Sequence, residues 1–219
     1  MSSRRNSSSR SRTPNAGFFL LLGGPTRYRE ELRLWNRGPN WIRDSNQGFQ
    51  HYDATTILLH WCTATLVGVL WIIGQTGDWA PKGFVRTGYW SIHVLLGFAL
   101  AIVLVWRIVW RALRGRRLPP ADSGVLRFVA EATHYALYGL LLTVVMLGIA
   151  NAFVRGYNLF DIVSLPQLGD SNLRRPITHW HGLAANILLG LGFFHAAAAL
   201  MHFYLWKDAV LPRMLPRSR

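Results

Sequence analysis

Residues 177–206 of the chain read ITHWHGLAANILLGLGFFHAAAALMHFYLW. This stretch is almost continuously apolar, and it contains histidine but no Asp, Glu, Lys or Arg. It exceeds the ~20 residues that an α-helix needs to cross the hydrocarbon core of a bilayer. Strands that cross membranes alternate apolar and polar residues, and this run does not. The stretch therefore predicts a transmembrane helix.

Three further apolar segments have a similar length: Ala54–Thr76, 89–109 and 130–153. Prolines fall between or after the segments and interrupt none of them. Hydrophobic residues make up 51% of the chain and charged residues 16%, well below the roughly one quarter that is typical of soluble domains. We therefore predict an all-α membrane protein, a four-helix transmembrane bundle that occupies residues 51–216.

The positions of the basic residues predict how the bundle is oriented. Of 24 Lys and Arg, nineteen lie before the first segment, between residues 107 and 127, or from Lys207 onward. The positive-inside rule then places both termini in the cytoplasm. The net charge of +14 thus reflects the membrane topology, and it favours binding to anionic lipid of the bilayer. No nucleic-acid partner is expected.

Two other features limit the possible classes. Residues 1–50 are rich in Arg and Ser, and they predict a disordered basic tail. The single cysteine, Cys62, excludes a disulfide scaffold, a zinc cluster and covalently attached haem.

The eight histidines are the candidate functional residues. Ionisable residues inside spanning helices are costly and usually functional. We expect no Asp, Glu, Lys or Arg deep in a span, because Arg107 lies at the end of the segment 89–109 and is counted with the bases of the connection that follows. Histidines on several helices, without Cys or carboxylate partners, favour metal ligation and above all haem.

Spacing and the size of neighbouring residues select four of these histidines. A porphyrin against a helix needs a small residue one turn from its ligand, and four histidines have Ala or Gly at i+4. They are His60, His93, His181 and His195. Bulky residues follow His134, His179 and His202 at the same spacing. Four ligands are the number that two six-coordinate haems require.

Depth in the membrane predicts how the four ligands pair. His181 and His195 are fourteen residues apart, on one face and about 21 Å apart along a helix. His60 and His195 each lie about 9 Å from the inner boundary, whereas His93 lies about 21 Å from it, level with His181. We therefore expect one haem between His60 and His195 and another between His93 and His181.

The remaining candidates have open roles. His134 and His202 lie at the inner interface, where each is either simply hydrated or a contact for a quinone or a haem propionate. Arg174 and Arg175 are either solvated loop residues or partners of the outer haem's propionates.

The sequence resembles the bacterial cytochrome b561 family, which includes the membrane cytochrome b subunits of nickel hydrogenases. The matching stretches are LLHW at residues 58–61, SIHVLLG at 91–97 and the helix from His179 to the ending YLWKD at 204–208. This ending is especially similar to the superoxide oxidase branch, which passes electrons from superoxide to ubiquinone. The resemblance implies two b-type haems, quinone-linked electron transfer and ligands at His60, His93, His181 and His195.

Three functions remain open at this point. The first is an oxidoreductase that passes electrons from a periplasmic-side donor, such as superoxide or an electron-transfer protein, to ubiquinone or another membrane quinone. The second is a haem-bearing anchor that relays electrons for a separate dehydrogenase or hydrogenase. The third is a haemless membrane scaffold.

Overall fold

A computed structural model describes residues 51–115, 118 and 124–216 of the chain. The predicted tail at residues 1–50 lies outside the described residues. Four long helices make up most of the described part: α4 (Ala54–Thr76), α5 (Phe84–Leu113), α6 (Gly124–Arg155) and α7 (Arg174–Met201). Each of the four is long and apolar enough to cross a membrane. The predicted all-α architecture with four spanning helices is confirmed.

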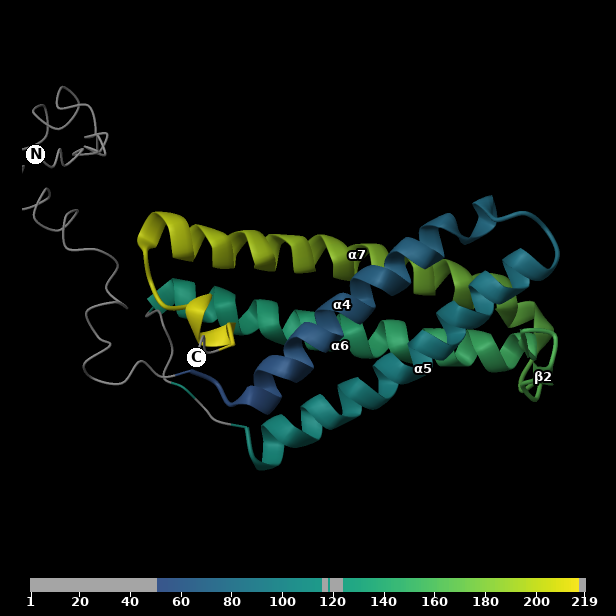
Figure 1. Ribbon diagram of the computed structural model, residues 1–219, viewed down its shortest axis with the longest axis horizontal. Helices are drawn as coiled ribbons and strands as arrows, with labels where there is room; N and C mark the ends of the chain where they lie inside the picture. Colours follow the sequence, from purple (N-terminus) through teal and green to yellow (C-terminus); the bar gives the residue numbers. More distant parts are fainter. Residues whose placement is uncertain (1–50, 116–117, 119–123, 217–219) are drawn as a thin grey trace, which may run out of the picture. The chain divides into compact units, whose positions relative to one another are not determined.

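The helices form two antiparallel pairs. The helix α4 packs along α5, and α6 packs along α7, whereas α4 and α7 have little backbone contact. Figure 1 shows α6 and α7 running side by side, with α4 and α5 at an angle to them. Any group held between the two pairs must therefore be held by side chains that reach across from one pair to the other.

The apolar core lies where the four helices meet. Its members come from all four helices: Leu70, Leu100, Leu104, Leu141, Val145 and Leu188. On α7, Leu188 lies seven residues from both His181 and His195. The core therefore occupies the level midway between these two histidines and separates them with tightly packed aliphatic side chains.

At the end of the bundle where α4 begins, three segments of the chain are tied together. Asp53 caps α4 by accepting from the backbone N–H of Thr56 at 2.9 Å, and it also accepts from Trp110 Nε1 of α5 at 2.9 Å. The segment after α7 folds back to the same place, where the Met214 carbonyl accepts from Trp61 Nε1 at 2.9 Å. We call this end the inner end, after the predicted topology.

The opposite end, the outer end, is closed by short connections. Between α4 and α5, the Arg86 guanidinium donates to the backbone carbonyls of Ala80 and Asp78 at 2.7 Å each. Between α6 and α7, the two-residue strands β1 (Asn158–Leu159) and β2 (Val163–Ser164) form an antiparallel hairpin (Figure 1). The hairpin is pinned to α5 by the fully buried Ser91, whose Oγ accepts from the backbone N–H of Phe160 at 2.8 Å.

Two predicted boundaries are wrong. The helix α5 runs from Phe84 through Leu113, beyond both ends of the predicted segment 89–109, so Arg107 lies six residues inside the helix and not at its end. The helix α7 begins at Arg174, which places Arg174 and Arg175 in its first turn, and it ends at Met201. Residues His202–Trp206 then form a wider π-helical turn. Apolar content marks only the part of a helix that lies in lipid, so it cannot show how far the helix continues into the interface.

Candidate functional site

The inner pair of histidines consists of His60 and His195. His60 lies in the second turn of α4, and His195 lies near the end of α7. Although these helices have little backbone contact, the centroids of the two imidazole rings are 6.5 Å apart. Both rings are partly buried. The fold therefore brings together two side chains that are 135 residues apart in the sequence.

The outer pair consists of His93 on α5 and His181 on α7, with ring centroids 6.2 Å apart. A glycine on a neighbouring helix gives each ring its space. A Cβ on Gly74 of α4 would lie 3.5 Å from His93 Cε1, and a Cβ on Gly148 of α6 would lie 3.0 Å from His181 Cε1. The helices α4 and α6 thus shape the outer pair without contributing a histidine to it.

The spacing of both pairs fits two ligands on opposite sides of one metal ion. Histidine nitrogen–metal bonds are about 2 Å long, which places the centroids of two such rings roughly 6 Å apart. No group of three or more His, Cys, Asp or Glu that could hold a metal lies within the described ranges. Two-histidine sites suit an iron whose other four ligands come from a macrocycle, as in haem.

The surroundings of the outer pair also fit such a group. The Nδ1 atom of His93 is buried beside the backbone of Leu70 on α4. One turn further along α5, a Cβ on Gly97 would have no heavy atom of a neighbouring segment within 4 Å. The open space beside it leaves room for a flat macrocycle.

Hydrogen bonding determines which nitrogen of His181 is free to bind a metal. Its Nδ1 lies 3.0 Å from the Val144 carbonyl oxygen on α6. A carbonyl only accepts, so Nδ1 carries the proton and Nε2 keeps the lone pair that can bind a metal. Metal-ligating histidines commonly have such a carbonyl partner, which fixes both the tautomer and the ring orientation. None of the four ligands predicted from the sequence lies on α6, so this contact shows that α6 contributes to the site through its backbone.

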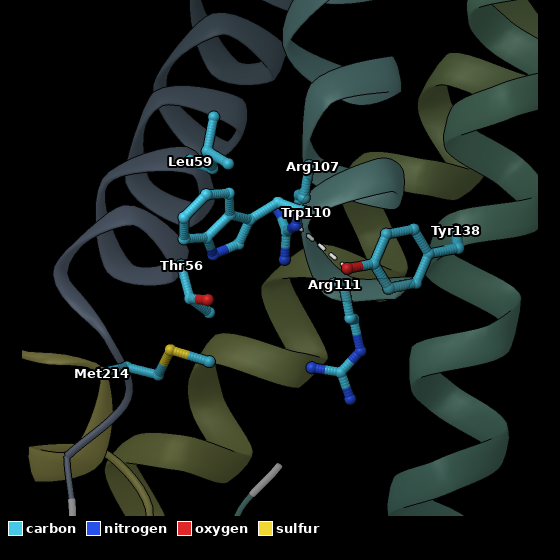
Figure 2. A pocket seen from close by; sticks show the side chains of 7 residues that line it. All are labelled: Thr56, Leu59, Arg107, Trp110, Arg111, Tyr138 and Met214. Atoms are coloured by element: carbon cyan, nitrogen blue, oxygen red, sulfur yellow. Dashed lines mark hydrogen bonds between the residues drawn. The ribbon is translucent and has the colours of Figure 1, made fainter. Parts of the chain in front are cut away.

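The structure adds Arg107 to the inner pair, and sequence reasoning missed it. Its Nη2 donates to His60 Nδ1 at 3.0 Å. Its Nε donates to the Tyr138 hydroxyl at 3.0 Å, the bond drawn in Figure 2. Sequence reasoning counted Arg107 with the bases of the connection after α5, whereas the structure places it within α5 and next to His60. The signal was present, because Arg107 is the one charged residue in the apolar run VLVWRIVW at residues 103–110.

His134 lies closer to the inner pair than expected. Its ring centroid is 5.2 Å from that of His195, and its Nδ1 donates to the carbonyl of Ala130 on its own helix at 2.7 Å. This centroid distance is shorter than the roughly 6 Å that two rings on one metal require. The structure therefore places His134 as a neighbour of His195 with a spacing that does not fit trans ligation.

His202 belongs to a separate contact at the inner end. Its Nδ1 donates to the carboxylate of Asp208, and its ring packs edge-on against Trp206 with centroids 4.3 Å apart. Lys207, with φ of 53°, turns the chain so that Asp208 comes back to His202. No helical periodicity links residues across such a turn, so the sequence held no signal for this pair.

The arginines at the start of α7 lie apart from the outer pair. Arg174 Nε donates to the Val154 carbonyl at 3.4 Å, and Arg175 is exposed. Another outer cation, Arg155, donates to Asn151 at 3.1 Å and to Thr178 at 2.8 Å. Within the described part of the chain, no hydrogen bond joins these three arginines to His93 or His181.

The fold and the site define a membrane protein with four spanning helices and histidines paired between them. Residues 51–217 match the family model described as prokaryotic cytochrome b561. The chain belongs to this family. Membership implies b-type haem and identifies the chain as a membrane b-type cytochrome in electron transfer.

Relatives of similar length support the same assignment. A Yersinia pestis protein named "Probable superoxide oxidase CybB" is 29% identical over 174 residues, which cover 77% of this chain and 97% of the relative. "Cytochrome b561 homolog 1" of Escherichia coli is 28% identical over 184 residues, which cover 77% of this chain and 98% of the relative. "Cytochrome b562" of Cereibacter sphaeroides is 30% identical over 176 residues, which cover 75% of this chain and 94% of the relative.

Proposed function

We propose that the chain holds two b-type haems, one between His60 and His195 and one between His93 and His181. The observation that carries this proposal is the ring spacing, 6.5 Å in the inner pair and 6.2 Å in the outer pair. His181 and His195 are fourteen residues apart on α7, so the two sites are separated by about 21 Å along that helix.

His60 with His195, and His93 with His181, would each hold one haem, which would supply one-electron redox chemistry when bound. The helix α7 contributes one ligand to each site and thereby fixes their separation. Between the two levels, Leu70, Leu104 and Leu188 exclude water from the centre of the bundle. The protein's own contribution is thus to hold two redox groups at constant distance in a dry interior.

We further propose that the chain lies in the bacterial inner membrane with both termini in the cytoplasm. The outer pair then faces the periplasm, together with five bases: Lys82, Arg86, Arg155, Arg174 and Arg175. Described hydrogen bonds of Arg86 and Arg155 go to carbonyl, amide and hydroxyl groups, which leave their charges in place. These charges steer an anionic donor toward the outer end, and superoxide is the donor that we propose. The similarity to a relative named as a probable superoxide oxidase supports this choice.

At the inner end we propose that a membrane quinone is the electron acceptor, next to His202. Full reduction of a quinone takes two electrons and two protons, so its site needs a proton donor as well as a nearby redox group. Nδ1 of His202 donates to the carboxylate of Asp208, which orients the ring. When the imidazole is protonated, its Nε2 can donate a hydrogen bond or a proton to a quinone carbonyl. Trp206 packs beside the ring and provides an apolar surface for a quinone ring.

The test uses the detergent-purified protein. A pyridine haemochrome assay should give two haems per chain, and one haem or none would contradict the haem proposal. Superoxide should reduce the haems, and added ubiquinone should reoxidise them, as the absorbance spectrum would show. Haems that quinol reduces but superoxide does not would instead support a relay subunit for a separate dehydrogenase or hydrogenase.

A further inference from the structure

Arg107 is a cation near the inner pair that lacks an anion. Its two described hydrogen bonds go to the imidazole of His60 and the phenol of Tyr138, each at 3.0 Å, and neither acceptor has a carboxylate. The ion pairs found within residues 51–115, 118 and 124–216 do not include Arg107. Charged side chains inside membrane spans are costly, and they are normally paired. An anion is therefore expected at this position.

The contact with His60 has a second consequence. A guanidinium only donates, so a neutral His60 that accepts at Nδ1 carries its proton on Nε2. A histidine that binds iron through Nε2 needs the opposite tautomer, with the proton on Nδ1. The hydrogen bond from Arg107 to Nδ1 and iron ligation by Nε2 therefore exclude each other for a neutral ring. Arg107 must release His60 when His60 takes up iron.

The space beside Arg107 can receive a ligand. A pocket beside Arg107 is lined by side chains from α4, α5 and α6 and by one from the C-terminal segment (Figure 2): Thr56, Leu59, Arg107, Trp110, Arg111, Tyr138 and Met214. Arg107 and Arg111 are one turn apart on α5, and like charges at this spacing repel each other. A negatively charged group in the pocket would remove this repulsion.

We propose that Arg107 exchanges partners when haem binds, releasing Nδ1 of His60 and holding a carboxylate of the inner haem instead. This inference rests on the proposed inner haem site. The b-type haem carries its own carboxylates, so the group that displaces Arg107 from His60 also supplies the missing anion. Arg107 is thus a positioning residue, which occupies the ligand in the empty site and stabilises the haem in the filled one.

The first test is the midpoint potential of each haem, measured by spectroscopic redox titration. Reduction adds one negative charge to a haem, and a cation held against it favours the reduced form. Arg107→Gln should therefore lower the potential of the inner haem. We expect about a tenfold smaller equilibrium constant for reduction, which is about 59 mV for one electron. The outer haem should keep its potential.

The matched control is Arg114→Gln. It removes the same charge from the exposed end of α5, outside the pocket, and should leave both potentials unchanged. If Arg107→Gln fails to accumulate, Arg107→Lys is the alternative variant. Lysine keeps the charge but loses the planar fork that binds carboxylates, so the potential of the inner haem should fall by less than we expect for Arg107→Gln. Inner potentials that match the Arg114→Gln control in both Arg107 variants would overturn the proposal.

The second test separates a held carboxylate from a charge that acts only at a distance. The wild type and Arg107→Gln are reconstituted with natural haem and with its dimethyl ester, in which both carboxylates are masked. If Arg107 holds a carboxylate, the effect of Arg107→Gln on the inner potential should shrink to less than half with the ester, as coupled partners in a double-mutant cycle do. An equal effect with both haems would overturn the proposal. A wild type that binds no inner haem when it is given natural haem would contradict the proposed function instead. Failure of this inference and failure of the proposed function are therefore distinguishable.

Discussion

His181 Nδ1 lies 3.0 Å from the carbonyl oxygen of Val144, and one turn further along α6 the Cα of Gly148 faces the same ring. Because Val144 and Gly148 are on the same face of α6, one helix both orients His181 and leaves it room. The orientation of this ligand therefore depends on a helix that carries no ligand of its own.

We expect Gly148→Ala to weaken the outer haem site. The added Cβ would lie 3.0 Å from His181 Cε1 and 3.4 Å from Nδ1, so the ring must give way by a few tenths of an ångström, and we expect this to disturb its bond to Val144. Loss of such an orienting partner costs about 10–100-fold in metal affinity. Haem content and the outer spectral component measure the loss. Gly139→Ala is the control, because it lies on the same helix with no heavy atom of a neighbouring segment within 4 Å of the new methyl. Full haem content in both variants would argue against the role of α6.

Double substitutions test the pairing of the ligands. His60→Ala and His195→Ala should each damage the same low-spin spectral component, and their combination should cost little more than either change alone. His93→Ala and His181→Ala should form an equally non-additive pair that affects the other component. The crossed double of His60→Ala with His93→Ala should abolish both components. A shared haem for His60 and His181 would refute both the pairing and the topology.

Gly97 tests whether a flat group lies beside His93. The space at its Cβ position is open, and alanine favours helix by about 1 kcal/mol over glycine, so Gly97→Ala should keep both haems. Gly97→Leu should displace the outer haem by filling this space, which absorbance per chain would detect. Gly88→Leu, five residues before His93 on a different face of α5, is the matched control. Retention of the outer haem in Gly97→Leu would show that the group lies elsewhere.

His202 and Asp208 test the quinone site separately from the haems. His202→Ala should keep both haems, because Trp206 packs against the ring and leaves no space for a porphyrin. Asp208→Asn should also keep both, since it removes only the carboxylate that orients His202. Both variants should be reduced by superoxide at the wild-type rate but should transfer electrons to ubiquinone more slowly, as stopped-flow absorbance would show. Unchanged quinone kinetics would make the pair purely structural, and loss of a haem in His202→Ala would contradict the assignment of His195.

Much of this protein could be predicted from the sequence because the relevant physics is local. A bilayer requires about 20 apolar residues per helix, so four apolar runs predict four spans, and the structure confirms them. The fourteen residues between His181 and His195 determine a shared face and a separation, because a helix has a constant rise and twist. Depth counting likewise predicted which histidines would lie level with each other, and the structure places those rings next to each other.

Only the tertiary structure decided the contacts around those histidines. The bonds from Arg107 to His60 and from His181 to Val144 depend on how each helix is rotated about its axis and how far it continues past the apolar run. The pairing of His202 with Asp208 depends on one residue in a left-handed conformation after a π-helical turn. The apolar pattern of a sequence predicts which parts of a helix contact lipid or the core, and these contacts involve the helix as a whole. The polar partners of a single side chain are selected only when neighbouring helices have packed against it.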